Sequence, residues 1–154
     1  MKHTLLSILL LPLLLFTACT AIEVTSVPYD SELKEVKICR NPKVKVADFL
    51  DVMRRHFSLH GIPAAVVDEN YEVKQDEYAV RYTALRSWDF VTYLSYADVD
   101  VYKGNSIVGT AHFHLKGKGG FSFYKWDSTN TKLTPMYEEL LKNYAMPEKT
   151  VVKP

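Results

Sequence analysis

The segment FVTYLSYADVDVYKGNSIVGTAHFHL, residues 90–115, consists of two strand-like runs on either side of a short polar turn at Lys103-Gly104-Asn105-Ser106. Val, Tyr, Phe and Thr are frequent in both runs, and such β-branched and aromatic residues favour β-strands. We expect strands at Phe90–Tyr102 and Ser106–Leu115, joined as a hairpin. The fold is therefore built around an antiparallel sheet.

The register of this hairpin follows from which positions are apolar. Apolar or small residues occupy odd-numbered positions in both runs: Ala97, Val99 and Val101, then Ile107, Gly109, Ala111, Phe113 and Leu115. Directly opposed residues point to the same face, so the loop must contain an odd number of residues. The parity predicts a three-residue loop with a bulge, and it places Asp98 opposite His112.

Further strands are expected on both sides of the hairpin. The runs are Leu33–Ile38, Ala64–Val67, Tyr78–Ser87 and Phe121–Trp126. Ser87-Trp88-Asp89 is a weak turn signal, so the third of these runs either turns there or continues through a bulge.

Two amphipathic helices complete the pattern. In Val46–Leu59 one apolar stripe is formed by Val46, Phe49, Leu50, Met53 and Phe57. The second helix is expected to start with Thr134 as N-cap and Pro135 at its first position, and to end before Pro147. Its stripe is Met136, Leu140, Leu141 and Tyr144.

The element order predicts an α+β fold. A mainly antiparallel sheet of about five to six strands carries two helices packed on one face, in strand-helix-strands-helix order. Residues 32–146 form a single domain of this kind, and residues 147–154 are a loose tail.

The N-terminus reads as an export signal. Residues 1–18 contain Lys2, an apolar run from Leu5 to Phe16 and small residues directly before Cys19, which is the layout of a signal peptide. The apolar run is interrupted by Pro12 and is far shorter than the ~20 residues of a membrane-spanning helix. The segment is therefore a signal for export and not an anchor.

Phe16-Thr17-Ala18-Cys19 resembles a bacterial lipobox, with Phe16 in place of the preferred leucine. Together with the element order, it makes the chain similar to small two-layer outer-membrane lipoproteins of Gram-negative bacteria, such as the lipopolysaccharide-assembly accessory lipoprotein and the activators of penicillin-binding proteins. The resemblance implies acylation of Cys19 and a tether over residues 19–31. Thr20 after the cysteine implies the outer membrane, with the domain facing the periplasm.

Composition excludes several other classes. Loss of the signal removes one of 19 basic residues and none of the 18 acidic ones, so the mature chain is close to neutral. No basic surface points to nucleic acid. If Cys19 is acylated, Cys39 is left without a partner cysteine; it is either a buried inert thiol at a strand end or half of a mixed disulfide.

Candidate chemical motifs are sparse. His56 and His60 are four residues apart on the first helix, and His112 and His114 share a strand face, but neither pair has a third ligand, so we expect no metal and no cofactor beyond the lipid. Gly117-Lys118-Gly119-Gly120 lacks the ending of a phosphate loop and reads as a hairpin turn. No motif supplies a catalytic nucleophile, so we expect a protein that is not an enzyme.

The even-numbered phase of the hairpin is the candidate working surface. It mixes aromatic and polar residues, as partner-binding surfaces do: Leu94, Tyr96, Asp98, Tyr102, Val108, Thr110, His112 and His114. We expect a non-catalytic accessory module that binds an envelope protein or a second copy of itself. The alternative is a lipoprotein that holds a small apolar or glycan ligand between sheet and helices, with tyrosines as stacking surfaces.

Overall fold

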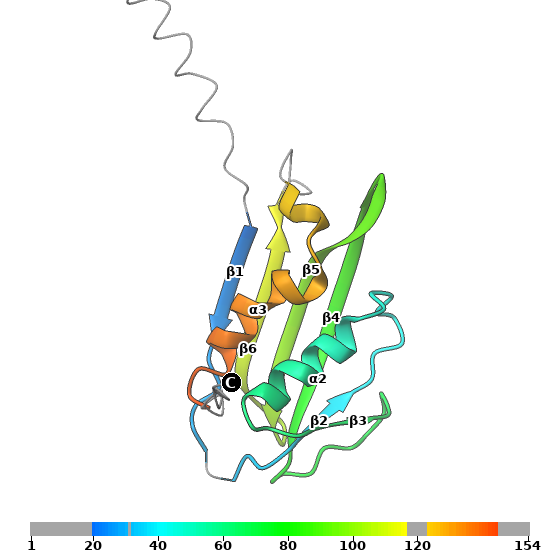
Figure 1. The fold of residues 1–154 in the computed structure, drawn as a ribbon. Coiled ribbons are helices and arrows are strands. Elements are labelled where there is room, and N and C mark those ends of the chain that lie inside the picture. The colour runs from blue at the N-terminus through cyan, green and yellow to red at the C-terminus, as the bar shows by residue number, and fades with distance from the viewer. Residues whose placement is uncertain (1–19, 31, 117–122, 145–154) are drawn as a thin grey trace, which may run out of the picture.

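A six-stranded sheet with two helices on one face makes up the chain in the computed structural model, which describes residues 20–30, 32–116 and 123–144 (Figure 1). The strand order is β1-β6-β5-β4-β2-β3. The strands are β1 Thr20–Thr25, β2 Val36–Cys39, β3 Ala64–Val67, β4 Tyr78–Asp89, β5 Val91–Lys103 and β6 Ser106–Leu115. The helices are α2 Phe49–Leu59 and α3 Thr129–Leu140, with a 3-10 turn, η3, at Phe123–Trp126. The predicted α+β class and element order are confirmed.

The sheet combines two kinds of connection. Long antiparallel strands β4, β5, β6 and β1 make one part, whereas β2 pairs in parallel with both β3 and β4. The chain between β2 and β3 contains α2, because two parallel neighbours need a crossover and cannot be joined by a tight turn. In Figure 1 both helices lie on the same side of the sheet, and the described residues place no helix on the other side.

The expectation that residues 19–31 are only a tether is wrong for part of that range. Thr20–Thr25 forms edge strand β1, which pairs antiparallel with β6 from Thr20↔Leu115 to Thr25↔Thr110. The chain continues inward at Val27, whose backbone N–H donates to the Leu140 carbonyl at 2.9 Å. Val27 also packs on Gly109, where an added Cβ would lie 2.6 Å from a Val27 methyl carbon, so only glycine fits there. The domain therefore includes the segment from Thr20 onward.

Two bulges change the hairpin that the parity argument describes. Asp98 does lie opposite His112, but Lys103 pairs with Ser106, so the turn has two residues. The extra residue lies in β6 at Val108, between the Val101↔Gly109 and Tyr102↔Ile107 pairs. The predicted three-residue loop is therefore wrong. On the far side of the bulge from the turn, the residues are paired as predicted. A bulge restores the same parity because it adds one residue to one strand.

A second bulge decides how β4 and β5 pair. The register shifts between Leu85↔Tyr96 and Arg86↔Leu94, so Ser95 has no directly opposed residue on β4. Strand β4 runs on through Ser87-Trp88-Asp89, and the chain reverses at Phe90, which has a φ of 63°. Ser87-Trp88-Asp89 is thus part of one long strand.

The C-terminal elements differ most from expectation. Phe123–Trp126 is a 3-10 turn where a strand is predicted, and residue 121 lies outside the described residues, as do residues 117–120. Helix α3 starts earlier than Thr134: Ser128 is its N-cap, and its hydroxyl accepts from the Thr131 N–H at 3.1 Å. Pro135 lies inside the helix. The described residues contain no helix that is long and apolar enough to cross a membrane.

The core lies between the sheet and the helices. Phe49 and Phe57 of α2, Tyr137 of α3 and Phe113 of β6 have no exposed surface. Phe49 stacks on Tyr82 with ring centroids 5.4 Å apart, and Phe57 meets Tyr137 edge-on at 6.4 Å. Residues 147–154, like residues 1–19, lie outside the described part of the chain.

Candidate functional site: the outer sheet face

The side of the sheet opposite the helices carries three rows of directly opposed residues across β1, β6, β5 and β4. Opposed residues point to the same face. The rows, from the chain start of β1 downward, are Ala21–His114–Tyr96–Leu85, then Glu23–His112–Asp98–Thr83, then Thr25–Thr110–Asp100–Arg81. We call this surface the outer sheet face.

A hydrogen-bonded group lies at the centre of the outer sheet face. The Asp98 carboxylate accepts from the Tyr96 hydroxyl and from Nδ1–H of His112, the latter at 2.5 Å. The bond from Tyr96 to Asp98 raises the pKa of Tyr96 to about 12, so this phenol stays protonated. The bond to Asp98 uses Nδ1 of His112, so the other ring nitrogen, Nε2, is not engaged in it.

The third row contains one acidic and one basic residue. Asp100 lies opposite Arg81, and burial raises the pKa of Asp100 while the nearby His112 lowers it. Next to this pair the surface is hollowed into a depression of about 530 Å³, which the segments around Asn41 and Asn70 border. Its lining residues are Cys39, Arg40, Asn41, Lys43, Glu69, Asn70, Arg81, Tyr82, Thr83, Asp98, Asp100 and Tyr102.

Most of the residues predicted for the working surface do lie on the outer sheet face, as the parity of the hairpin predicts. Tyr96, Asp98, Thr110, His112 and His114 lie in the three rows. Tyr102 lies beyond the rows and lines the depression.

Two predicted residues are not on this surface. Leu94 is buried and belongs to the core, because the Ser95 bulge breaks the alternation of β5. Val108 is the unpaired residue of the second bulge and packs against the core, whereas its neighbour Ile107 is exposed. Assigning Leu94 and Val108 to the outer face is therefore wrong, and a bulge is the cause in both cases.

The outer sheet face also holds a carboxylate–imidazole pair, and a thiol lies in the adjoining depression. Asp98 orients His112 as a carboxylate orients a general base. Cys39 lines the adjoining depression; it is a free, buried thiol at the end of β2, and burial raises its pKa, which disfavours the thiolate. The prediction of a buried thiol at a strand end is confirmed.

The helix histidines are in the core. His56 and His60 are both buried; His56 stacks on Tyr137 at 4.8 Å, and Nδ1 of His60 bonds the Tyr144 carbonyl at 2.8 Å. Burial lowers the pKa of His56, which keeps it neutral. Among the residues that the structure describes, no three His, Cys, Asp or Glu side chains are grouped so that they could hold a metal ion.

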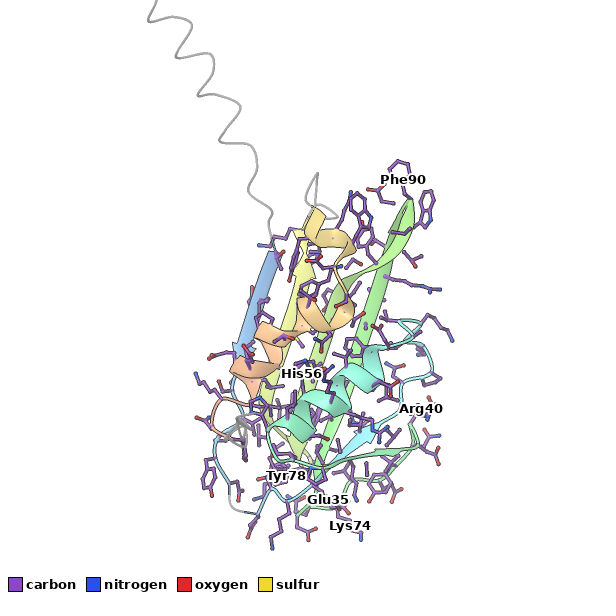
Figure 2. The ribbon with its side chains drawn as sticks, in the orientation of Figure 1. Glu35, Arg40, His56, Lys74, Tyr78 and Phe90 are labelled. Atoms are coloured by element: carbon purple, nitrogen blue, oxygen red, sulfur yellow. The ribbon has the colours of Figure 1, made fainter. Side chains whose placement is uncertain are left out.

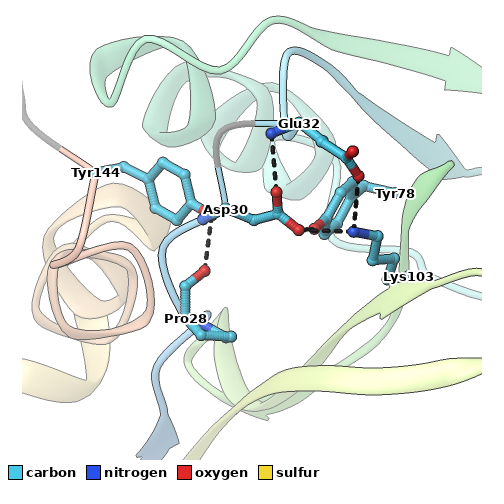
Figure 3. A network of polar contacts seen from close by, with 6 residues as sticks. All are labelled: Pro28, Asp30, Glu32, Tyr78, Lys103 and Tyr144. Atoms are coloured by element: carbon cyan, nitrogen blue, oxygen red, sulfur yellow. Dashed lines mark hydrogen bonds and ion pairs between the residues drawn. The ribbon is translucent and has the colours of Figure 1, made fainter. Parts of the chain in front are cut away.

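A separate polar cluster fixes the chain that follows β1 (Figure 3). The Asp30 carboxylate accepts from Lys103 at 2.6 Å, from the Tyr78 hydroxyl at 2.5 Å and from the Glu32 N–H at 2.8 Å. Lys103 also bonds Glu32 at 3.1 Å. The Asp30 N–H in turn donates to Tyr144, whose hydroxyl donates to the Pro28 carbonyl. This cluster holds the segment after β1 against the turn end of the hairpin.

The sequence argument missed several residues of the site. Glu23 lies opposite His112 on β1, and Arg81 lies opposite Asp100 on β4. The alternation of Ile22 and Val24, both packed on the core, with Ala21, Glu23 and Thr25 was a strand signal in the presumed tether.

No protein-family model matches the chain, and no curated protein matches its sequence. Its structure is similar to two crystal forms of the PelC dodecamer from Paraburkholderia phytofirmans, one of them a single-substitution variant, each with a TM-score of 0.53. The identities are 8% and 10%, and the overlaps cover 84% and 82% of this chain and 100% and 99% of the PelC chains. A minor lipoprotein from Acinetobacter baumannii overlaps at a TM-score of 0.35 and 12% identity, over 71% of this chain and 91% of that one. At these identities the PelC likeness shows a shared fold.

Proposed function

We propose that this chain is a lipoprotein held at the outer membrane through a covalent lipid on Cys19, with its domain facing the periplasm. There it acts as a non-catalytic interaction module of the cell envelope and needs neither a cofactor nor nucleic acid. The outer sheet face binds the partner, which is a second copy of the chain or another envelope protein.

The observation that carries the proposal is the make-up of the outer sheet face. The face opposite the helices spans four strands and presents polar, charged and aromatic side chains in three rows. The Asp98 carboxylate holds Tyr96 and His112 in place, so little side-chain entropy is lost when a partner docks on them. The fold shared with PelC, which is a dodecamer, favours a second copy as the partner.

The alternative function, in which a ligand binds between the sheet and the helices, has no comparable support among the described residues. A ligand between sheet and helices would lie among side chains that have no exposed surface, such as Phe49, Phe57 and Phe113. The depression instead lies beside the outer sheet face and is lined mainly by polar side chains.

Lipid attachment is tested by metabolic labelling with palmitate. We expect Cys19 to be labelled and Cys19→Ser to lose the label, because acylation requires the thiol of the lipobox cysteine. Cys39→Ser is the matched control and should label like the wild type, since Cys39 is buried. Unchanged labelling of Cys19→Ser would refute the anchor.

Partner binding is tested by a charge on the outer sheet face. His114 is exposed next to Tyr96, so His114→Glu places a carboxylate at the interface without disturbing the core. We expect this variant to keep the wild-type melting temperature but to lose the oligomer seen by native mass spectrometry or light scattering, or the crosslink to another envelope protein. Arg55→Glu on the exposed side of α2 is the control and should retain both. Loss of the oligomer or crosslink in Arg55→Glu alone, at an unchanged melting temperature, would place the interface on the helices.

A further inference from the structure

The end of the molecule at the β4–β5 turn carries a cluster of exposed apolar side chains. Trp88 is 70% exposed, Phe90 85% and Val91 55%, and Phe90 sits at the reversal itself (Figure 2). Trp126 of η3 is 38% exposed and joins them, since its indole N–H donates to the Asp89 carbonyl at 3.2 Å. We call Trp88, Phe90, Val91 and Trp126 the aromatic tip. Single exposed apolar residues are common, but several of them gathered at one end of the molecule indicate a contact surface.

The register places the start of the domain at the same end of the molecule. Strand β1 begins at Thr20, opposite Leu115, and β5 passes Tyr96 opposite His114 on its way from the tip. The aromatic tip therefore projects from the end at which β1 begins, as Figure 1 also shows. Thr20 directly follows Cys19, the cysteine of the lipobox.

The distances allow the tip and the lipid to meet one surface. Phe90 is five positions from Ser95, which lies level with Thr20, so the tip extends roughly 17 Å further at about 3.3 Å per residue. Strand β6 separates β1 from β5, a sideways distance of roughly 10 Å at about 4.8 Å per strand. If the domain is tilted on a membrane, the cysteine and the tip both reach the membrane surface, and the tip enters somewhat deeper.

The chemistry of the tip suits the boundary between lipid headgroups and acyl chains. Tryptophan is enriched there because its ring is apolar and its N–H polar. The one carboxylate at the turn, Asp89, is paired with Lys125, whose ammonium lies 4.5 Å from the Trp126 ring centroid. Exposed Arg86 and Lys116 lie near this end and can meet lipid phosphates.

We propose that the aromatic tip inserts into the membrane to which Cys19 is attached, so that the domain has two contacts with the bilayer and a fixed orientation. This rests on the proposed lipid attachment. The lipid holds the chain at the bilayer but leaves the domain free to turn about its attachment, and a second membrane contact fixes the orientation. The orientation keeps the β5–β6 turn end away from the membrane and leaves the outer sheet face free along its side.

The tryptophans provide a direct test, because the chain has only two and both are in the tip. The full-length lipidated protein is reconstituted into vesicles of phosphatidylethanolamine and phosphatidylglycerol, with and without acyl chains brominated near the headgroup. We expect the brominated lipid to quench most of the tryptophan emission, and we expect the vesicles to protect it from acrylamide.

The matched control moves the indole to the opposite end. In a chain with Trp88→Phe and Trp126→Phe, the exposed turn residue Ile107 is changed by Ile107→Trp, and we expect emission that acrylamide quenches and brominated lipid does not. Equal lipid quenching in the wild type and this control would overturn the proposal, and so would protection from acrylamide that appears without vesicles. Palmitate labelling of the same samples reports the anchor separately, so failure of the tip and failure of lipidation are told apart.

Discussion

Asp30 shows how a single carboxylate can hold the segment after β1 in place. It accepts from Lys103, Tyr78 and the Glu32 N–H, and these bonds, that from Lys103 first, hold its pKa well below the ordinary value of 3.8. The same contacts raise the pKa of Lys103. Both residues are partly exposed, so solvent weakens the ion pair and the hydrogen bonds carry much of the effect.

We predict that Asp30→Asn lowers the melting temperature at neutral pH, because the amide loses the charge and the ion pair. Glu35→Gln, which breaks an exposed pair with Lys37, is the control and should have little effect. A lowered folded-state pKa stabilises the fold at pH values above 3.8, and this stabilisation disappears as the pH falls toward the folded-state pKa. The difference between wild type and Asp30→Asn in thermal unfolding should therefore shrink below pH 3.8; a difference independent of pH would contradict the assignment.

Individual residues also show where sequence reasoning stops. Asp98 and His112 could be placed opposite one another because parity is a local property of a hairpin. Leu94 and Ile107 could not be placed, because each lies next to a bulge and a bulge reverses the alternation on one side of it. The sequence carries no strong signal for either bulge, since neither Ser95 nor Val108 is a glycine.

At the scale of elements, the two ends of the domain were the hardest to predict. Strand β1 has only six residues, and its pairing depends on the free edge of β6 far along the chain. The pattern Thr134-Pro135 predicts one start for helix α3, whereas the structure starts the helix after Ser128. Packing decides between them: Thr129, Lys132 and Leu133 are buried, so the helix must include them.

The start of α3 can be measured. Ser128→Ala removes the acceptor for the Thr131 N–H and should cost about 1 kcal/mol in the free energy of unfolding. Thr134→Ala is the matched control, because the Thr134 hydroxyl only donates to the Asn130 carbonyl within the helix, and it should cost clearly less in urea unfolding. The reverse ranking would mean that the helix begins at Thr134.

At the scale of the whole molecule, the sheet separates two roles. One side packs α2 and α3 over a filled core, and the other carries the outer sheet face. The sequence predicted this division, since the odd phase of the hairpin is apolar or small and the even phase is mixed. It could not predict Glu23 or Arg81, because their places depend on which strands flank the hairpin.

The central claim is that partners meet the outer sheet face, and site-specific photo-crosslinking in living cells tests it most directly. A photoreactive phenylalanine derivative replaces His114 in one strain and Arg55 in another, since both are exposed but lie on opposite sides of the sheet. The account predicts a crosslinked adduct from position 114, at the mass of two copies or of one copy with an envelope protein, and none from position 55. An adduct from position 55 with none from position 114 would contradict it.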